Sequence, residues 1–492
     1  MRSAPALVTP TMRRALSDPM LLGAVLKGES WRAWKVILIA MMGERLDDEE
    51  RAIFTKLTGR PQEPLERVEE FWGLIGRRGG KSLAMSVLIV FLACFCDYRS
   101  VLAAGERPVV LCLAQNQEQA RVVFGYVCGA IDSNPMLARL VRNRTAESLE
   151  LVSGVSIAIR AASYRGVRGV TCVAAVLDEI CFFYGADTGS ANPDSAILDA
   201  LRPSLATTYG PLIAISSPYA RRGEAFETWR RHFGERGDKL ILVAQGASRD
   251  FNPSLPQRVV DRAMERDPAA ASAEYLGTWR SDLQAFVSLE AVEACVSPGV
   301  YERGPLPGQR YTAFTDPSGG SADSFTLAIC HRERDGRVVL DVVRERQPPF
   351  SPEAVVSEFS LTLRSYRCAS VSGDKYAGVF PRELFQKCGV KYTPSERSKS
   401  ELYVELLPMI NSQRVDLLDD RKAIAQLVGL ERRTSRVGKD SIDHLPGGHD
   451  DRINAIAGAV VTAVSKRPMM ISAEMVAAAG RPSSTAVWVW GS

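Results

Sequence analysis

The sequence predicts an α/β protein with two domains, in which a doubly wound parallel sheet comes first and a second, strand-rich α/β block follows. Three observations predict this class. Apolar runs bounded by turn residues alternate with helical patterns between Phe71 and Gln245. Several of these runs are apolar on both faces, which is typical of strands in a parallel sheet that helices cover on both sides. A second group of strands begins at Gln309, after a polar stretch without strong strands.

The composition is that of a globular protein. The chain has 492 residues, of which 46% are hydrophobic and 24% charged, and this length favours two or three domains. The net charge of +4 permits a nucleic-acid partner without arguing for one. Ten cysteines without a CxxC spacing, together with four histidines, argue against a structural zinc site and indicate free thiols in a reducing compartment.

The longest apolar run, 83–96, is about 14 residues long, and a membrane-spanning helix needs ~20. The N-terminus lacks an apolar stretch of secretory length. We therefore expect a soluble intracellular protein and no membrane contact.

The expected elements follow from the apolar pattern. The strands expected in the first sheet are, in chain order, 71–75, 108–114, 155–161, 172–179, 211–217 and 239–245. Helices are expected after Lys81, after Gln115 and at 221–233. In the second block, the strands RYTAFTD, SFTLAIC, RVVLDVVRE and SVSGDKY precede helices that end in an Ala-rich stretch. The expected division is a first domain at 1–245 with an N-terminal extension at 1–30, a connecting segment at 246–300, a second domain at 301–465 and a mobile tail at 466–492.

A candidate phosphate-binding loop follows the first strand and opens a helix. It consists of Gly76, Arg77, Arg78, Gly79, Gly80, Lys81 and Ser82. In this context backbone N–H groups and a helix N-terminus converge on anionic oxygens. Lys81 would neutralise the β- and γ-phosphates of a nucleotide, and Ser82 would hold Mg²⁺. Ile75 stands where the general loop pattern has its first glycine, so a turn without a ligand is the alternative.

An acidic pair strengthens the nucleotide interpretation. The apolar strand VAAVLDEI ends in Asp178 and Glu179, in the same α/β block as the loop. Asp178 can reach Mg²⁺ through water, and Glu179 can orient and deprotonate an attacking water. A strand followed by a solvated acidic turn is the alternative for the pair alone. The loop and the pair together predict nucleotide hydrolysis.

Two further features fit the same site. Ser216 and Ser217 end the strand PLIAISS, where a hydroxyl could sense the γ-phosphate, although a simple strand cap before proline explains them equally well. Trp31 and Trp34 precede the first core strand, and one of them could stack on adenine. Core packing is the alternative, and the stronger one for at least one of the two rings.

The second block carries carboxylates at the ends of its elements. Asp316 ends one strand, Asp374 ends another, and Asp450 and Asp451 open the Ala-rich helix. Acids brought together from separate elements can hold two divalent ions that activate water and stabilise a leaving 3′-oxygen in phosphodiester cleavage. Taken singly, Asp450 can be a helix cap and Asp374 a turn residue. Asp323 is a weaker candidate.

Together these motifs resemble the large terminase subunit of tailed double-stranded DNA bacteriophages, over roughly residues 31–464. GRRGGKS resembles the variant Walker A motif of that family, in which an arginine, here Arg77, follows the first small residue. LDEI resembles Walker B with Glu179 as its catalytic carboxylate, and ISSP resembles the coupling motif. Asp316, Asp374 and the acids of HDD align with the nuclease acids, and which of Asp450 and Asp451 binds metal stays open. Shorter likenesses are AQNQEQA at 114–120, RGVRG at 165–169 and EYLGTW at 274–279.

The resemblance implies an N-terminal P-loop ATPase domain of the ASCE (RecA-like) class that drives DNA into the procapsid. It also implies a C-terminal RNase H-like nuclease domain that cuts concatemeric DNA. The implied cofactors are ATP and Mg²⁺, with Mn²⁺ as an alternative at the nuclease site. The implied partners are double-stranded DNA, the portal protein, the small terminase subunit and further copies of the chain in a ring such as a pentamer, with a monomer in solution left open. The implied location is the host cytoplasm, with transient docking on the procapsid.

Other interpretations make different predictions. A helicase-like ATPase without nuclease activity shares the first set of motifs but predicts a second RecA-like domain. A non-catalytic DNA-binding component of the packaging machinery predicts decayed sites, which the intact Lys81, Glu179 and HDD do not favour. A transposase-type enzyme leaves the N-terminal motifs unexplained. Candidate DNA-contacting stretches, each also explained by solvated charge, are Arg221–Arg222, Arg230–Arg231 and 431–439.

Overall fold

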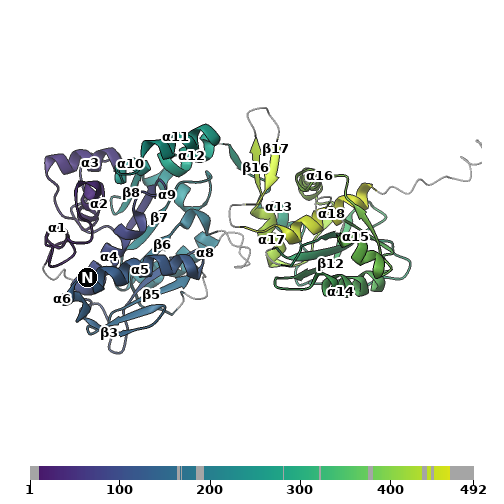
Figure 1. The fold of residues 1–492 in the computed structure, drawn as a ribbon, viewed down its shortest axis with the longest axis horizontal. Helices are drawn as coiled ribbons and strands as arrows, with labels where there is room; N and C mark the ends of the chain where they lie inside the picture. The colour runs from purple at the N-terminus through teal and green to yellow at the C-terminus, as the bar shows by residue number, and fades with distance from the viewer. Residues whose placement is uncertain are drawn as a thin grey trace, which may run out of the picture. The chain divides into compact units, whose positions relative to one another are not determined.

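The computed structural model describes residues 10–465 except 163–166, 168, 184–192, 281, 321–322, 375–379, 435–439 and 445–447. The chain forms two compact units (Figure 1). The first unit comprises Met1–Glu293 and Asp420–Asp450, and the second comprises Ala294–Asp419 and Asp451–Ser492. This division differs from the expected boundaries at 245 and 300, because the segment after residue 245 packs on the first sheet and a later segment returns to the first unit.

The first unit is built on a sheet in which eight described strands have the order β3-β4-β5-β2-β6-β7-β1-β8. The strands from β5 to β8 in this order run parallel, and β3 and β4 form an antiparallel extension at one edge. The bounds are β1 (Glu70–Ile75), β2 (Val109–Ala114), β3 (Val141–Arg144), β4 (Ser148–Leu151), β5 (Ser156–Ala161), β6 (Cys172–Asp178), β7 (Leu212–Ser216) and β8 (Ile241–Gly246). Each strand that the apolar runs predicted is confirmed.

Helices cover both faces of this sheet, as doubly wound packing requires. Along β1, Phe71 and Ile75 belong to one core cluster, and Trp72 and Leu74 belong to the other. The first cluster packs under α2, α4 and α5, and the second packs under α8 and α9 (Figure 1). The helices before β8 are α1 (Met12–Ser17), η1 (Glu29–Trp31), α2 (Arg32–Met41), α3 (Asp48–Thr58), α4 (Lys81–Phe95), α5 (Gln117–Asp132), α6 (Pro135–Ala138), η2 (Ile180–Phe182), α8 (Pro193–Ala206) and α9 (Gly223–His232).

The segment expected to connect the domains is instead folded into the first unit. It forms α10 (Ser248–Phe251), α11 (Gln257–Arg266), α12 (Pro268–Leu276), β9 (Leu283–Ala285) and α13 (Leu289–Glu293). The returning segment contains α17 (Arg421–Val428), β16 (Glu431–Thr434) and β17 (Asp440–Asp443). Here β9, β16 and β17 form a small antiparallel sheet. The polar composition of 246–300 did not indicate that this segment packs on the first unit, because few of its side chains are buried. Helix α11, for example, buries only Val260 among its described side chains.

The second unit has a mixed sheet of order β14-β13-β10-β11-β12-β15. Three strands form an antiparallel meander, and β13 and β14 add in parallel beside β10. This is the arrangement of an RNase H-like fold. The strands are β10 (Tyr311–Asp316), β11 (Phe325–Arg332), β12 (Val338–Arg346), β13 (Ser370–Gly373), β14 (Lys391–Pro394) and β15 (Val415–Asp416). The helices are α14 (Pro352–Ser365), α15 (Phe380–Lys387), α16 (Lys399–Asn411) and α18 (Asp451–Ser465).

Helices also cover both faces of the second sheet. The side chains of α14 and α15 share a buried cluster with Ala313, while the adjacent Phe314 faces α18. A Cβ added at Gly458 of α18 would collide with the Phe314 ring. Glycine is therefore what allows α18 to lie close against β10, and this brings the first turn of the helix to the end of that strand.

In the described residues, no helix is long and apolar enough to cross a membrane. The ten cysteines all lie in described positions and none of them forms a disulfide.

Candidate functional site

The candidate phosphate loop lies between the end of β1 and the start of α4. Its backbone turns sharply: Arg78 and Gly80 have φ of 64° and 82°, and the Gly79 N–H donates to the Gly76 carbonyl at 3.1 Å. Glycine is required at Gly76, because an added Cβ would lie 2.7 Å from the backbone N of Ser248. The N-terminus of α4, a helix of 15 residues, therefore opens directly from a tight loop, as in an anion-binding site.

Lys81 is the charged centre of this loop. Its side chain is only 6% exposed, and its Nζ donates to the Ile75 carbonyl at 3.0 Å and to Ser217 Oγ at 2.9 Å. The same Nζ lies 3.3 Å from Glu179 Oε1. The candidate phosphate loop, the acidic pair after β6 and the serines after β7 thus meet at one lysine.

Ser82 and Asp178 present oxygen atoms suited to Mg²⁺. Ser82 Oγ lies 3.4 Å from Asp178 Oδ2, while the buried Asp178 Oδ1 has no hydrogen-bond partner among the described residues. Burial, with the adjacent Glu179 charge, raises the pKa of Asp178 to about 7, and Lys81 opposes this shift. A buried carboxylate with one open oxygen next to a hydroxyl fits a hard divalent cation or its bound water. These two residues would hold the ion, which would supply charge neutralisation for a leaving phosphate.

Glu179 is held in a defined orientation. It has φ of 59°, and its N–H donates to the Ile215 carbonyl at 2.8 Å. Ser216 Oγ and the Ser217 N–H both donate to its Oε2, at 3.0 and 3.1 Å. Its side chain is 32% exposed, so it keeps access to water. A non-glycine residue in the left-handed region is strained, and such strain is typical of residues that the surrounding structure holds for a chemical role.

Two predicted residues of the loop region take other places. Trp34 is fully buried, its Nε1 donates to the Gly79 carbonyl at 2.7 Å, and its ring packs 4.9 Å from Phe251, so it offers no face to adenine. The proposed adenine contact of Trp34 is therefore wrong, because apolar burial fixes this ring beneath the loop. Trp31 is half-buried above Gly80.

Arg77 faces the segment after β8. Its N–H donates to the Glu274 carbonyl, and its guanidinium lies 3.5 Å from the Glu274 carboxylate. The side chain is 61% exposed. An exposed ion pair of this length contributes little to stability, so Arg77 can leave Glu274 for a more strongly charged partner.

The end of β7 is connected to the β16–β17 hairpin. Three residues beyond Ser216, Tyr219 donates its hydroxyl to Glu431 Oε2 at 2.7 Å, and Arg222 Nη2 donates to Glu431 Oε1 at 2.8 Å. Glu431 is 1% exposed, and burial raises its pKa while Arg222 and Tyr219 oppose the shift. The predicted DNA contact of Arg222 is thus not supported in this structure, because its charge neutralises a buried carboxylate.

We expect Tyr219→Phe to lower the thermal unfolding midpoint of the first unit by about 1–3 °C, because the buried Glu431 carboxylate loses one hydrogen bond. Tyr126→Phe is the matched control, since Tyr126 lies exposed on α5. Differential scanning calorimetry compares the two variants. Equal unfolding midpoints would show that the Tyr219–Glu431 hydrogen bond does not contribute to the thermal stability of the first unit.

The second acidic set forms around the ends of β10 and β13. These strands pair in parallel through Thr315 and Gly373, so Asp316 and Asp374 follow directly from neighbouring positions. Burial raises the pKa of Tyr392, and the charges of Asp374 and Asp316 both act in the same direction. The Tyr392 hydroxyl donates to the Asp374 carbonyl at 3.0 Å. The two predicted acids therefore lie on one edge of the sheet, around one tyrosine.

Helix α18 brings a third acid to this edge. It begins at Asp451, whose carbonyl accepts a 2.7 Å hydrogen bond from Thr326 Oγ1, and Thr326 lies opposite Asp316 in the β10–β11 pair. One turn later, Asn454 Nδ2 donates to Asp316 Oδ2 at 2.8 Å. Asp316, Asp374 and Asp451 are thus carried by elements that meet, and carboxylates of this kind suit divalent metal ions.

Asp450 belongs to the first unit, where it lies close to Asp443 and His444. It is buried, and its carboxylate forms a group with Asp443 and His444 in which one ligand atom from each lies within 4.8 Å of the others.

Sequence reasoning missed several members of these sites. Asn454 follows Asp451 by three residues, so the helical period was a usable signal that both face the sheet. Tyr392 and the pair Asp443–His444 had no such signal, because strand pairing and a hairpin bring them into place. The RGVRG likeness at 165–169 lies mostly outside the described residues.

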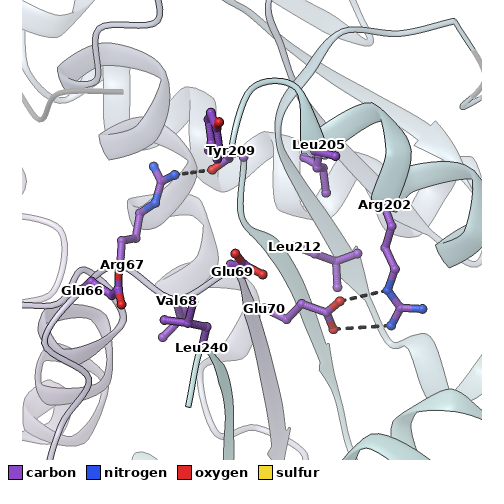
Figure 2. Close-up of a pocket in the computed structure, with 12 residues that line it drawn as sticks. Glu66, Arg67, Val68, Glu69, Glu70, Arg202, Leu205, Tyr209, Leu212 and Leu240 are labelled. Atoms are coloured by element: carbon purple, nitrogen blue, oxygen red, sulfur yellow. Dashed lines mark hydrogen bonds and ion pairs between the residues drawn. The ribbon is translucent and has the colours of Figure 1, made fainter. Parts of the chain in front are cut away.

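A pocket of about 610 Å³ lies at the other edge of the first sheet, where β1, β7 and β8 begin. Figure 2 shows Arg202 reaching Glu70 across this pocket, with the Arg202 Nε at 2.9 Å from Glu70 Oε1, and Arg67 reaching the Tyr209 carbonyl. The candidate phosphate loop follows the opposite end of β1, so this pocket is separate from that loop.

Among the known proteins compared with this chain, only solved structures match it. No family model matches the chain, and no curated protein matches it. Solved structures that it resembles include bacteriophage large terminases. The HK97 large terminase aligns with 89% of this chain and 100% of its own, at 17% identity and a TM-score of 0.37. The large terminase of a thermophilic bacteriophage, solved in complex with ADP, aligns with 81% of this chain and 95% of its own, at 13% identity and a TM-score of 0.37.

A third similar structure is the large terminase nuclease of the thermophilic phage G20c with bound magnesium. It aligns with 36% of this chain and 98% of its own, at 16% identity and a TM-score of 0.32. These low scores transfer no residue's role to this chain.

Proposed function

We propose that this chain is a large terminase subunit that hydrolyses ATP to move double-stranded DNA into a procapsid and cuts concatemeric DNA with divalent metal ions. One observation carries the proposal. A single chain combines a glycine-rich loop before a helix, where Lys81, Glu179 and Ser217 meet, with a set of carboxylates at the strand ends of a second, mixed sheet.

The residues take the following parts in ATP hydrolysis. The ammonium of Lys81 and the backbone N–H groups of Arg78 and Gly80 would bind the phosphates, while Ser82 and Asp178 would hold Mg²⁺. Glu179 accepts a proton from the attacking water, and its hydrogen bonds from Ser216 and Ser217 keep the carboxylate aimed. Loss of the γ-phosphate would remove a negative charge from beside Lys81. The hydrogen bond from Lys81 to Ser217 would then transmit the change in the position of Lys81 to the end of β7.

The second unit would cleave the DNA. Asp316, Asp374 and Asp451, with Asp450 as a further candidate ligand, would hold Mg²⁺ or Mn²⁺, and the ions would activate water and stabilise the leaving oxygen. Asn454 would hold the Asp316 carboxylate in place through its 2.8 Å bond. The proposed partners are double-stranded DNA, a portal protein, a small terminase subunit and further copies of the chain in a ring. The proposed location is the host cytoplasm, with transient docking on the procapsid.

A helicase-like ATPase built from two RecA-like domains fits less well. The described strands of the second unit form an antiparallel meander with parallel additions, whereas a RecA-like domain has a parallel sheet. No observation favours a non-catalytic component over the enzyme.

Two assays on the purified full-length chain test the proposed function. We expect double-stranded DNA to stimulate ATP hydrolysis, and we expect Mg²⁺ or Mn²⁺ to support plasmid cleavage that EDTA abolishes. ATPase activity without any metal-dependent cleavage would favour the helicase-like interpretation. Absence of both activities would favour the non-catalytic one.

We further expect Arg77→Ala to lower the DNA-stimulated rate of ATP hydrolysis by about 10³-fold, as removal of an arginine finger does. The physical reason is that a guanidinium released from Glu274 can stabilise charge on the transferred phosphate, within its own subunit or on a ring neighbour. Arg258→Ala removes an equal charge from the exposed face of α11 and serves as the control. A wild-type rate in Arg77→Ala would remove Arg77 from the mechanism.

A further inference from the structure

We infer that Ser248, Asn252 and Trp34 are positioning residues that hold the phosphate loop in its binding conformation. This inference rests on the proposed ATPase function and deepens it. The three side chains donate hydrogen bonds to the carbonyls of three consecutive loop residues: Ser248 Oγ to Arg77 at 2.6 Å, Asn252 Nδ2 to Arg78 at 2.9 Å, and Trp34 Nε1 to Gly79 at 2.7 Å.

These bonds determine which way the loop amides point. A trans peptide is planar and directs its C=O and its N–H to opposite sides. Donors that hold the carbonyls of Arg77 and Gly79 therefore turn the N–H groups of Arg78 and Gly80 away from those donors. N–H groups turned away from protein acceptors are what a phosphate-binding loop offers to anionic oxygens.

The loop needs such support because its conformation is costly. Arg78 has φ of 64°, in the left-handed region that non-glycine residues rarely adopt because of steric strain. The only loop hydrogen bond between described backbone groups inside Gly76–Gly80 joins Gly79 to Gly76. Side-chain donors from outside therefore supply what the loop cannot supply itself, and they select the strained conformation before nucleotide arrives.

The donors are themselves rigidly held. Phe251, which lies between Ser248 and Asn252 in the sequence, is buried, and its ring centroid lies 4.9 Å from that of Trp34. The Asn252 N–H donates to the Ser248 carbonyl at 2.8 Å. Asp250 stabilises the same turn. Its carboxylate accepts a hydrogen bond from the Ala247 N–H at 2.8 Å and forms an ion pair with Lys56 Nζ at 2.6 Å. The three donors thus belong to one packed group around Phe251.

This group gives a function to the segment after β8, which looked like a connection between domains. Ser248 of its helix α10 and the C-cap residue Asn252 supply two donors, and α12 adds the Glu274 carbonyl, which accepts from the Arg77 N–H. The segment forms the outer wall of the phosphate loop.

The test uses the full-length chain and measures ADP affinity in the presence of Mg²⁺ by isothermal titration calorimetry. Each of Ser248→Ala and Asn252→Ala should weaken ADP binding about 5- to 10-fold, the value of one lost neutral hydrogen bond. Ser248→Thr, which keeps the hydroxyl, should restore affinity to within about 2-fold, because rescue depends on the donor alone. Ser272→Ala on α12 is the matched control and should bind ADP as the wild type does.

A second readout separates positioning from general destabilisation. The unfolding midpoint of the nucleotide-free protein and the metal-dependent plasmid cleavage should change little in Ser248→Ala. Unchanged ADP affinity in both alanine variants, or equal loss in Ser248→Ala and Ser248→Thr, would overturn the inference. If the wild type itself neither binds ADP nor hydrolyses ATP, the proposed function fails, and that result is distinct from a wild type that binds ADP and variants that match it.

Discussion

Glu179→Gln is expected to reduce ATP hydrolysis by about 10²–10⁴-fold, the contribution of a positioned general base. ATP binding and metal-dependent DNA cleavage should persist. The amide keeps an oxygen that can accept from Ser216 Oγ and the Ser217 N–H, so the local structure should hold. It cannot accept a proton from water, so the chemical step alone should fail. A steady-state phosphate-release assay with and without double-stranded DNA measures the effect.

Glu265→Gln is the matched control, because this glutamate is exposed on α11. Its rate should equal that of the wild type. Retained hydrolysis in Glu179→Gln would move the catalytic role to another carboxylate. Joint loss of hydrolysis and DNA cleavage would show instead that the substitution disturbs the whole chain.

Asp316→Asn is expected to have the reverse profile, with plasmid cleavage reduced by at least about 10²-fold and ATP hydrolysis retained. Removing one carboxylate charge from a two-metal site costs several kcal/mol of stabilisation at the reacting phosphate. The asparagine oxygen can still accept from Asn454 Nδ2, so α18 should stay docked on β10. The measurement is Mn²⁺-dependent nicking and linearisation of supercoiled plasmid, followed over time by gel electrophoresis.

Asp335→Asn, in the exposed turn between β11 and β12, supplies the control and should cut plasmid normally. Wild-type cleavage by Asp316→Asn would exclude Asp316 as a metal ligand. A shift in the metal concentration needed for half-maximal cleavage, without a change in the maximal rate, would place Asp316 in binding and not in the chemical step.

The elements of the first sheet were predictable because their strands are apolar on both faces. The runs at 108–114 and 172–179, for example, became β2 and β6, and neighbouring residues such as Phe71 and Trp72 bury on opposite faces. The order of the strands was not predictable, since it depends on which strands pair. That order puts β1 between β7 and β8, and so brings Ser217 to Lys81.

The predictions for single residues failed where burial decides the role. A tryptophan before a phosphate loop can stack on a base or pack in the core, and only the closed core around Phe251 shows that Trp34 packs. The segment at 246–300 has the polar composition of a linker. This segment joins the first unit through a few hydrogen bonds, such as that from Ser248 to the Arg77 carbonyl. Hydrogen bonds of this kind cannot be detected from hydrophobic periodicity.

Local motifs and apolar periodicity predicted the fold class of both units and singled out the loop at 76–82 and the acids Asp178, Glu179, Asp316, Asp374 and Asp451 as candidates, because such patterns depend on neighbouring residues. How these residues are held depends on contacts between distant parts of the chain. Contacts such as Glu179 to Ser216, Asp316 to Asn454 and Asn252 to Arg78 join residues that are 37, 138 and 174 positions apart. Pairings over such distances arise from strand order and helix packing, which the local pattern does not encode.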